Sequence, residues 1–184
     1  VPLAHKALAF VDMEIPLREG GARGQVMLAP RIEARLLQDA NVQKHEKVLE
    51  VGTGSGYMAA LLAHRAQRVI TVEIEPELAR TARANLQKAG VHNVEVLQLD
   101  ASQGIKAEGP FDVIVLSGSV AEVPQVLMAQ LKVGGRLVGI VGEEPGMSAT
   151  VVTRADETTW TTTTPWDTVA PRLLNFPAPS RFKF

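Results

Sequence analysis

The chain has 184 residues, 46% of them hydrophobic, which is enough to bury the core of one globular domain. Its formal net charge is −1, with no long run of either sign, which argues against a broad electrostatic surface for nucleic acid. Cysteine is absent, which excludes disulfides, thiolate metal sites and a cysteine nucleophile. No apolar run approaches the ~20 residues that span a bilayer, and no signal peptide is recognisable, so we expect a cytoplasmic protein.

The predicted elements alternate between strands and helices along most of the chain. Residues 1–30 are interrupted by Pro and Gly, which indicates loops, and because the chain starts at Val1 without Met we expect an N-terminal segment to be missing. Helices are expected over 31–40, 56–65, 75–89 and 123–131. Strands are expected over 47–51, 68–72, 94–99, 111–116 and 136–141, with a turn at 134–135 before the last of these. Two more strands, 149–154 and 158–164, follow without a long helix between them.

This order predicts an α/β fold with a doubly wound, mostly parallel seven-stranded sheet. The last two strands would form a C-terminal antiparallel hairpin at one edge. We find no internal repeat and no low-complexity linker, so residues 1–184 are expected to form a single domain.

A glycine-rich loop follows the first core strand and opens the next helix. The spacing is E-x-G-x-G-x-G, running from Glu50 through Gly52, Gly54 and Gly56 with Thr53 and Ser55 between them. Glycine lets backbone N–H groups approach a ligand closely, and a helix N-terminus favours anionic groups. Dinucleotide sites place the third glycine one position later, where this chain has Tyr57.

Acidic residues end three successive strands, namely Glu50, Glu73 and Asp100. Glu73 follows the loop by about 20 residues, the spacing at which an acid accepts hydrogen bonds from ribose hydroxyls. Asp100 can accept from an adenine amino group while the backbone beside it, at Ala101, meets a ring nitrogen. A lone acid of this kind is more often a helix cap or solvated, but the three together predict a nucleoside-type ligand.

Several segments resemble class I S-adenosyl-L-methionine (SAM) methyltransferases, and residues 9–142 resemble the protein-L-isoaspartate O-methyltransferase family. The general matches are segments 48–57, 72–79, 111–115 and 131–137. Segment 24–30 is more specific, because it lies where the family carries G-Q-T-I-S-x-P, and Glu122-Val123-Pro124 matches a family E-I-P. The resemblance implies a Rossmann-like SAM domain whose cofactor-binding residues are Glu50, Gly52, Thr53, Gly54, Ser55, Gly56, Glu73, Ile74, Asp100, Ala101 and Ser117.

The resemblance also implies an activity, methylation of the free carboxylate of isoaspartyl residues in damaged proteins or peptides. A carboxylate with a pKa of about 4 is already ionised near neutrality, so no general base is needed. The enzyme would align the reacting atoms and exclude water. On this reading residues 1–30 face the substrate, 31–142 bind SAM, and 143–184 form the hairpin and tail, in a monomer or weak homodimer without metal, nucleic acid or membrane.

The chain departs from the family pattern at the acceptor site. Val26 and Leu28 stand where the family has Thr and Ser, and that Ser is the residue given the active-site role. Losing one such hydrogen bond can cost roughly 1–3 kcal/mol. Ser117 and Ser119, after the fourth core strand, are the candidate replacements.

Two alternatives remain open. One is a related methyltransferase with another acceptor, which the loss of both hydroxyls favours. The other is a non-catalytic SAM-binding module, with residues 180–184 as a docking tail. Nucleic-acid methylation fits less well, because residues 116–119 lack the N/D-P-P-Y type of motif, and the four His show no metal-ligand spacing.

Overall fold

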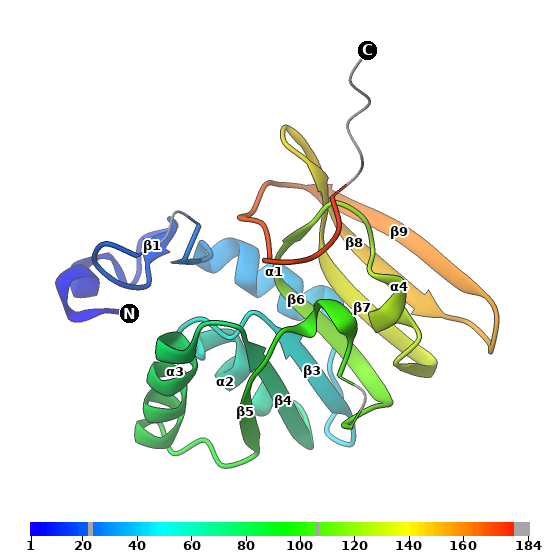
Figure 1. Cartoon of the computed structure of the whole chain (residues 1–184), viewed down its shortest axis with the longest axis horizontal. Helices are drawn as coiled ribbons and strands as arrows, with labels where there is room; N and C mark the ends of the chain where they lie inside the picture. The colour runs from blue at the N-terminus through cyan, green and yellow to red at the C-terminus, as the bar shows by residue number, and fades with distance from the viewer. Residues whose placement is uncertain (22–23, 106, 179–184) are drawn as a thin grey trace.

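A seven-stranded sheet forms the centre of the computed structural model, which describes residues 1–21, 24–105 and 107–178 (Figure 1). The strand order is β5-β4-β3-β6-β7-β8-β9. In chain order the strands are β3 (Lys47–Val51), β4 (Arg68–Glu73), β5 (Val94–Gln98), β6 (Phe111–Val120), β7 (Leu131–Glu143), β8 (Gly146–Arg154) and β9 (Trp160–Asp167). Neighbours from β5 to β7 are parallel, whereas β8 and β9 are antiparallel. The predicted fold class, including the C-terminal hairpin, is confirmed.

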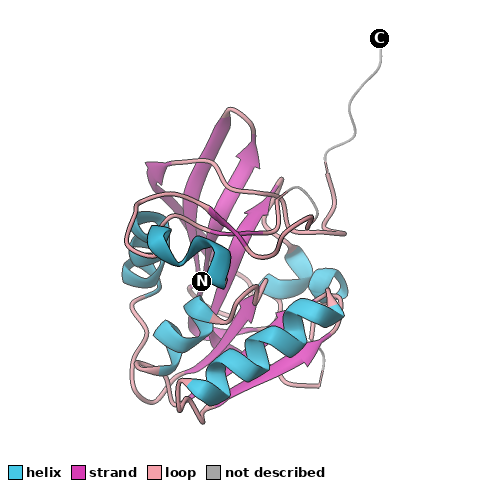
Figure 2. Cartoon of the chain, turned by 90° about the vertical axis from the view of Figure 1, so that its left-hand side faces the viewer, coloured by secondary structure: helices cyan, strands magenta, loops and turns pink. Residues whose placement is uncertain are grey.

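Three helices pack on one face of this sheet (Figure 1 and Figure 2). They are α1 (Pro30–Ala40), α2 (Tyr57–Ala63) and α3 (Pro76–Lys88), and their apolar stripes pack with alternate residues of the strands. The other face is covered more thinly, by a 3-10 helix at Ala101–Gln103, by the short α4 (Gln125–Met128) and by apolar side chains near the C-terminus. No helix within the described ranges is long and apolar enough to cross a membrane.

The strands β6, β7 and β8 are each at least three residues longer than predicted, and α4 is less than half as long. The expected turn at 134–135 is wrong, because β7 already begins at Leu131, which pairs with Phe111. The two glycines lie in an irregularity within the strand, where Gly134 has a φ of +82° and a Cβ on Gly135 would meet the Asp112 carbonyl at 2.8 Å. This early start leaves only 125–128 for the helix expected over 123–131.

The first 30 residues also contain more structure than expected. A 3-10 helix covers Leu3–Leu8, and β1 (Ile15–Pro16) pairs antiparallel with β2 (Val26–Met27). The two-stranded ribbon is separate from the main sheet. Arg18, just after β1, forms ion pairs with Glu75 and Glu77, so the ribbon is held against the start of α3.

Residues 170–178, here called the C-terminal segment, return to the sheet after β9. Figure 1 shows the segment, coloured red, passing beside the end of β6. The backbone of Ser119 donates to the Pro171 carbonyl at 2.7 Å and accepts from the Leu173 N–H at 2.9 Å, while its hydroxyl donates to the Ala170 carbonyl at 2.8 Å. Because Ser119 is fully buried, these bonds fix the segment beside the end of β6.

A buried ion pair joins α1, the following loop and β7. Arg136 donates to both carboxylate oxygens of Glu46 at 2.9 Å and to the Ala40 carbonyl at 2.6 Å. The two side chains are only 16% and 9% exposed. Removing one partner of such a bidentate pair leaves the other charge buried and unpaired.

We expect Arg136→Met to lower the free energy of unfolding by roughly 3–5 kcal/mol, because the Glu46 carboxylate loses its partner while staying buried. Urea unfolding measures the change. Arg68→Met is the matched control: Arg68 pairs with Glu95 with both side chains about half exposed, so its loss should cost under about 1 kcal/mol. Equal costs for the two variants would contradict this account.

Candidate functional site

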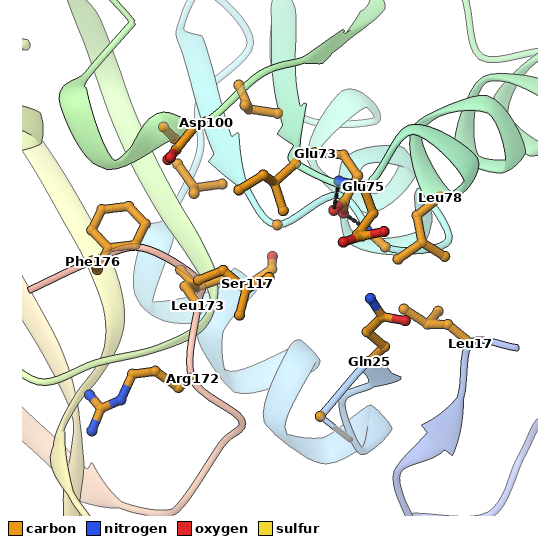
Figure 3. A pocket seen from close by; sticks show the side chains of 18 of the residues that line it. Leu17, Gln25, Glu73, Glu75, Leu78, Asp100, Ser117, Arg172, Leu173 and Phe176 are labelled. Atoms are coloured by element: carbon orange, nitrogen blue, oxygen red, sulfur yellow. Dashed lines mark hydrogen bonds between the residues drawn. The ribbon is translucent and has the colours of Figure 1, made fainter. Parts of the chain in front are cut away.

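A pocket with about 680 Å³ of empty space, open solvent included, lies where the parallel strands end. We call it the main pocket. Figure 3 shows Glu73 and Glu75 on one side of it and Asp100 with Phe176 on the other. The pocket therefore brings together the ends of β4 and β5, which are adjacent strands, with the C-terminal segment. Ligands of doubly wound sheets bind at this edge.

The glycine loop is held in place by the side chain of Glu73. One oxygen, Oε2, accepts from the Gly54 N–H at 2.9 Å, and Oε1 accepts from the Glu75 N–H at 3.0 Å. Gly54 has a φ of +53°, a conformation that side chains disfavour. Glu73 is 6% exposed and lines the main pocket, so lone pairs left by these two bonds can accept from a ligand.

Asp100 begins the 3-10 helix on the opposite side of the main pocket. Its Oδ1 accepts from the Ser102 N–H at 2.8 Å, and its Oδ2 accepts from the Asn175 amide at 2.7 Å. The bond from Ser102, joined by that from Asn175, lowers the pKa of the Asp100 carboxyl. Ala101 and Ile74 also line the main pocket.

Glu50 is fully buried and ties three strands together. Its Oε2 accepts from the Thr71 hydroxyl on β4 at 2.6 Å, and its Oε1 accepts from the Ser117 hydroxyl on β6 at 2.7 Å. Thr53 Oγ1 lies 2.6 Å from Thr71 Oγ1 and extends the network into the glycine loop. Burial raises the pKa of the Glu50 carboxyl to about 7, even though both hydroxyl bonds favour the ionised form.

A smaller space of about 280 Å³, here called the second hollow, adjoins the main pocket at the glycine loop. Glu50 lines it, and so do Val26, Leu28 and Ser117. Leu28 is 6% exposed and belongs to the hydrophobic core between α1 and the sheet. Where the acceptor motif of the family carries hydroxyls, this wall is therefore apolar.

A buried acid in the second hollow, Glu33 on α1, does not belong to the predicted site. It is 6% exposed, and burial together with the charge of Glu50 raises the pKa of its carboxyl to about 8. A sequence signal existed: Glu33 lies three residues before Leu36 and seven before Ala40, on the buried stripe of the predicted helix.

Segments around Leu17 and Leu173 supply the other walls, which the sequence analysis did not predict. Leu17 follows β1 and covers the glycine loop, since a Cβ on Gly54 would meet its Cδ1 at 3.3 Å. Leu173 does the same from the C-terminal segment: a Cβ on Gly52 would lie 2.9 Å from its Cδ2. These contacts join residues 37 or more positions apart, so no local pattern reports them.

The predicted residues do not all meet at one place. Gly52, Gly54 and Ser117 line both spaces, whereas Thr53 and Ser55 line only the second hollow. Gly56 begins α2 with a φ of +85° and lies behind the loop, next to Leu86 of α3. Ser119 lines neither space, because its hydroxyl is engaged with the C-terminal segment.

Comparisons with known proteins point to one family. The family model described as protein-L-isoaspartate(D-aspartate) O-methyltransferase (PCMT) matches residues 1–168. A protein-L-isoaspartate O-methyltransferase of Methanoculleus marisnigri is 44% identical over 142 residues, which are 77% of this chain and 63% of that protein. One of Ignicoccus hospitalis is 42% identical over 149 residues, 79% of this chain and 69% of that protein. The chain thus spans less than two thirds of the first relative's length.

Solved structures share the fold. A protein-L-isoaspartate O-methyltransferase superimposes with a TM-score of 0.80 at 24% identity, covering 94% of this chain and 55% of the other. A Plasmodium falciparum protein assigned to the same activity, solved with S-adenosyl-L-homocysteine, has a TM-score of 0.73 at 20% identity, covering 91% and 83%.

Glu33→Gln tests the buried acid through its effect on stability at different pH values. The native carboxyl titrates near pH 8, whereas an unfolded glutamate titrates near its ordinary value of about 4.3. Between these values the native state keeps a proton that the unfolded state has lost, so stability falls as the pH rises. Gln does not ionise, so we expect its advantage over Glu33 to grow by a few kcal/mol from pH 5 to pH 8.

Urea unfolding at both pH values measures this difference, with Glu95→Gln at the exposed edge of the sheet as the control. A Glu33→Gln effect that is the same at pH 5 and pH 8 would show that the carboxyl is not held protonated.

Proposed function

This chain belongs to the protein-L-isoaspartate(D-aspartate) O-methyltransferase family, and from that premise we propose that it transfers a methyl group from SAM to the free carboxylate of isoaspartyl residues in proteins or peptides. The observation that carries the proposal is the carboxylate of Glu73, anchored by two backbone N–H groups at the edge of the main pocket. The same pocket is lined by the glycine loop and, on its opposite side, by a second acid, Asp100.

The residues of the main pocket fit the adenosyl part of this cofactor. Glu73 would accept from the ribose hydroxyls, and Asp100 would accept from the adenine amino group. Leu78, Leu99 and Phe176 offer apolar surface to a base. When bound, the cofactor supplies a methyl group on a positively charged sulfur, which an ionised oxygen can attack.

The chain's own residues then have the task of orienting and enclosing the reactants. An ionised acceptor carboxylate needs no base, so the reaction requires no proton transfer from the residues that line the two spaces. Ser117 lines both spaces, and its hydroxyl, already donated to Glu50, is fixed in orientation. Leu17 and Leu173 cover the loop and exclude water from it.

A second candidate keeps the cofactor and changes the acceptor. The observation that favours it is the apolar wall formed by Val26 and Leu28, which offers no hydroxyl to a substrate carboxylate. Such a wall suits a less polar acceptor group. Only the first candidate methylates an isoaspartyl peptide in preference to its aspartyl isomer, so one assay with the two peptides separates the candidates.

We expect Glu73→Gln to weaken S-adenosyl-L-homocysteine binding at least tenfold, measured by isothermal titration calorimetry. An amide turns one of the two acceptor oxygens into an N–H donor that faces a backbone N–H, so the loop loses a bond and the ribose loses an acceptor. Glu75→Gln is the matched control, because Glu75 lines the same pocket with a side chain that is 36% exposed. Equal losses from both variants would contradict the assignment.

We expect the unmodified chain to transfer labelled methyl groups from SAM to an isoaspartyl peptide and not to its aspartyl isomer. Val26→Thr should raise kcat/KM for the isoaspartyl peptide roughly 2–10-fold, because it restores a hydroxyl at constant volume beside both spaces. Leu28→Ser would restore the other hydroxyl but would also open a cavity in the core.

Val133→Thr, at a position that is 55% exposed on β7, is the control and should change nothing. Equal labelling of the two peptides would rule out the isoaspartyl acceptor. So would a lack of labelling by the unmodified chain, Val26→Thr and Leu28→Ser while S-adenosyl-L-homocysteine still binds. The second case would favour the other acceptor or the non-catalytic module.

A further inference from the structure

The second hollow contains a carboxylate oxygen that has no partner. Glu33 is 6% exposed, and its Oε2 makes no hydrogen bond with any described residue. Leaving a buried polar atom unpaired costs roughly 1–3 kcal/mol, and more for a charged one. Because native proteins rarely keep such an atom without a use, it points to a donor that arrives with a ligand.

The hollow attracts cations. Two carboxyl groups line it, Glu33 from α1 and Glu50 from β3, and the described lining residues include no Lys, Arg or His. The other titratable group in the lining is Tyr57 of α2, while Glu73 of β4 acts on Glu50. Each acid is buried, and the charge of Glu50 disfavours ionisation of Glu33, so the pair retains a proton near neutral pH.

The second hollow continues the main pocket. The two spaces share five lining residues, namely Leu17, Val26, Gly52, Gly54 and Ser117. A ligand whose adenosyl part lies between Glu73 and Asp100 therefore reaches the hollow by extending across Gly52 and Gly54. The part that extends from the adenosyl group of SAM is an amino acid, whose α-amino group carries three N–H donors and a positive charge.

We propose that Glu33, supported by Glu50, binds the α-ammonium group at the amino-acid end of the cofactor, and that this chain releases a proton when the cofactor binds. The proposal rests on the proposed SAM-binding function. As the ammonium N–H donates to Glu33 Oε2, the positive charge stabilises the ionised form of both carboxyls, and the proton that the pair retained leaves to the buffer. The ammonium keeps its own protons, so the charge balances.

Calorimetry with the full chain at pH 7.5 tests the proposal with two ligands: S-adenosyl-L-homocysteine and its analogue that lacks only the α-amino group. Titration in buffers of different ionisation enthalpy counts the protons released. For the unmodified chain we expect about one proton released with S-adenosyl-L-homocysteine and none with the analogue. Glu33→Gln should weaken S-adenosyl-L-homocysteine about tenfold, abolish the release, and leave the affinity for the analogue within about twofold.

Asp39→Asn is the matched control on the same helix. Asp39 accepts from the indole N–H of Trp166 at 2.7 Å and lines neither space. The substitution therefore removes a charge outside both spaces, and it should change neither the affinity for S-adenosyl-L-homocysteine nor the proton release.

Four results would overturn the proposal. Binding of S-adenosyl-L-homocysteine without proton release, or equal weakening of both ligands by Glu33→Gln, would show that Glu33 does not meet the ammonium group. If Glu33→Gln changed only the KM of an amine-bearing acceptor, the carboxyl pair would belong to the acceptor instead. If the unmodified chain bound neither ligand, the proposed function would fail first and the subsite with it.

Discussion

The carboxyl group of Glu50 joins three neighbouring strands, and the site is arranged around its hydrogen bonds. A fully buried acid costs several kcal/mol unless its oxygens are satisfied. Thr71 and Ser117 satisfy both, which fixes β4 and β6 on either side of β3. The glycine loop leaves β3 directly beyond Glu50, so this constraint also sets where the loop begins and where Glu73 can receive its N–H groups.

Segments near both ends of the described chain complete the pocket that the sheet begins. Leu17 and Leu173 come from opposite ends and pack on the glycine loop at Gly54 and Gly52, where a Cβ would lie 3.3 Å and 2.9 Å from their methyl groups. The buried Ser119 holds the second of these segments against β6. The Ser119 hydroxyl therefore stabilises the wall of the pocket, and Ser117, two residues earlier, is the one that reaches both spaces.

Local pattern was enough to predict the strands and the residues at their ends. The sheet, the glycine loop, Glu73 and Asp100 follow from apolar runs and from the rule that parallel strands end at one edge. The length of β7 did not follow, because its start depends on pairing with Phe111, 20 residues earlier. The walls from Leu17 and Leu173 are likewise long-range contacts. The burial of Glu33 was predictable, since the residue lies on the buried stripe of a helix. Its raised pKa was not, because it depends also on the charge of Glu50.

The most direct test of the central claim is a crystal structure of this chain with S-adenosyl-L-homocysteine. We predict the adenine beside Asp100 and Ala101, the ribose hydroxyls on Glu73, and the α-amino nitrogen within hydrogen-bond distance of Glu33 Oε2. A ligand that occupies the main pocket without touching Glu73, or that turns its amino-acid end away from the second hollow, would contradict the account.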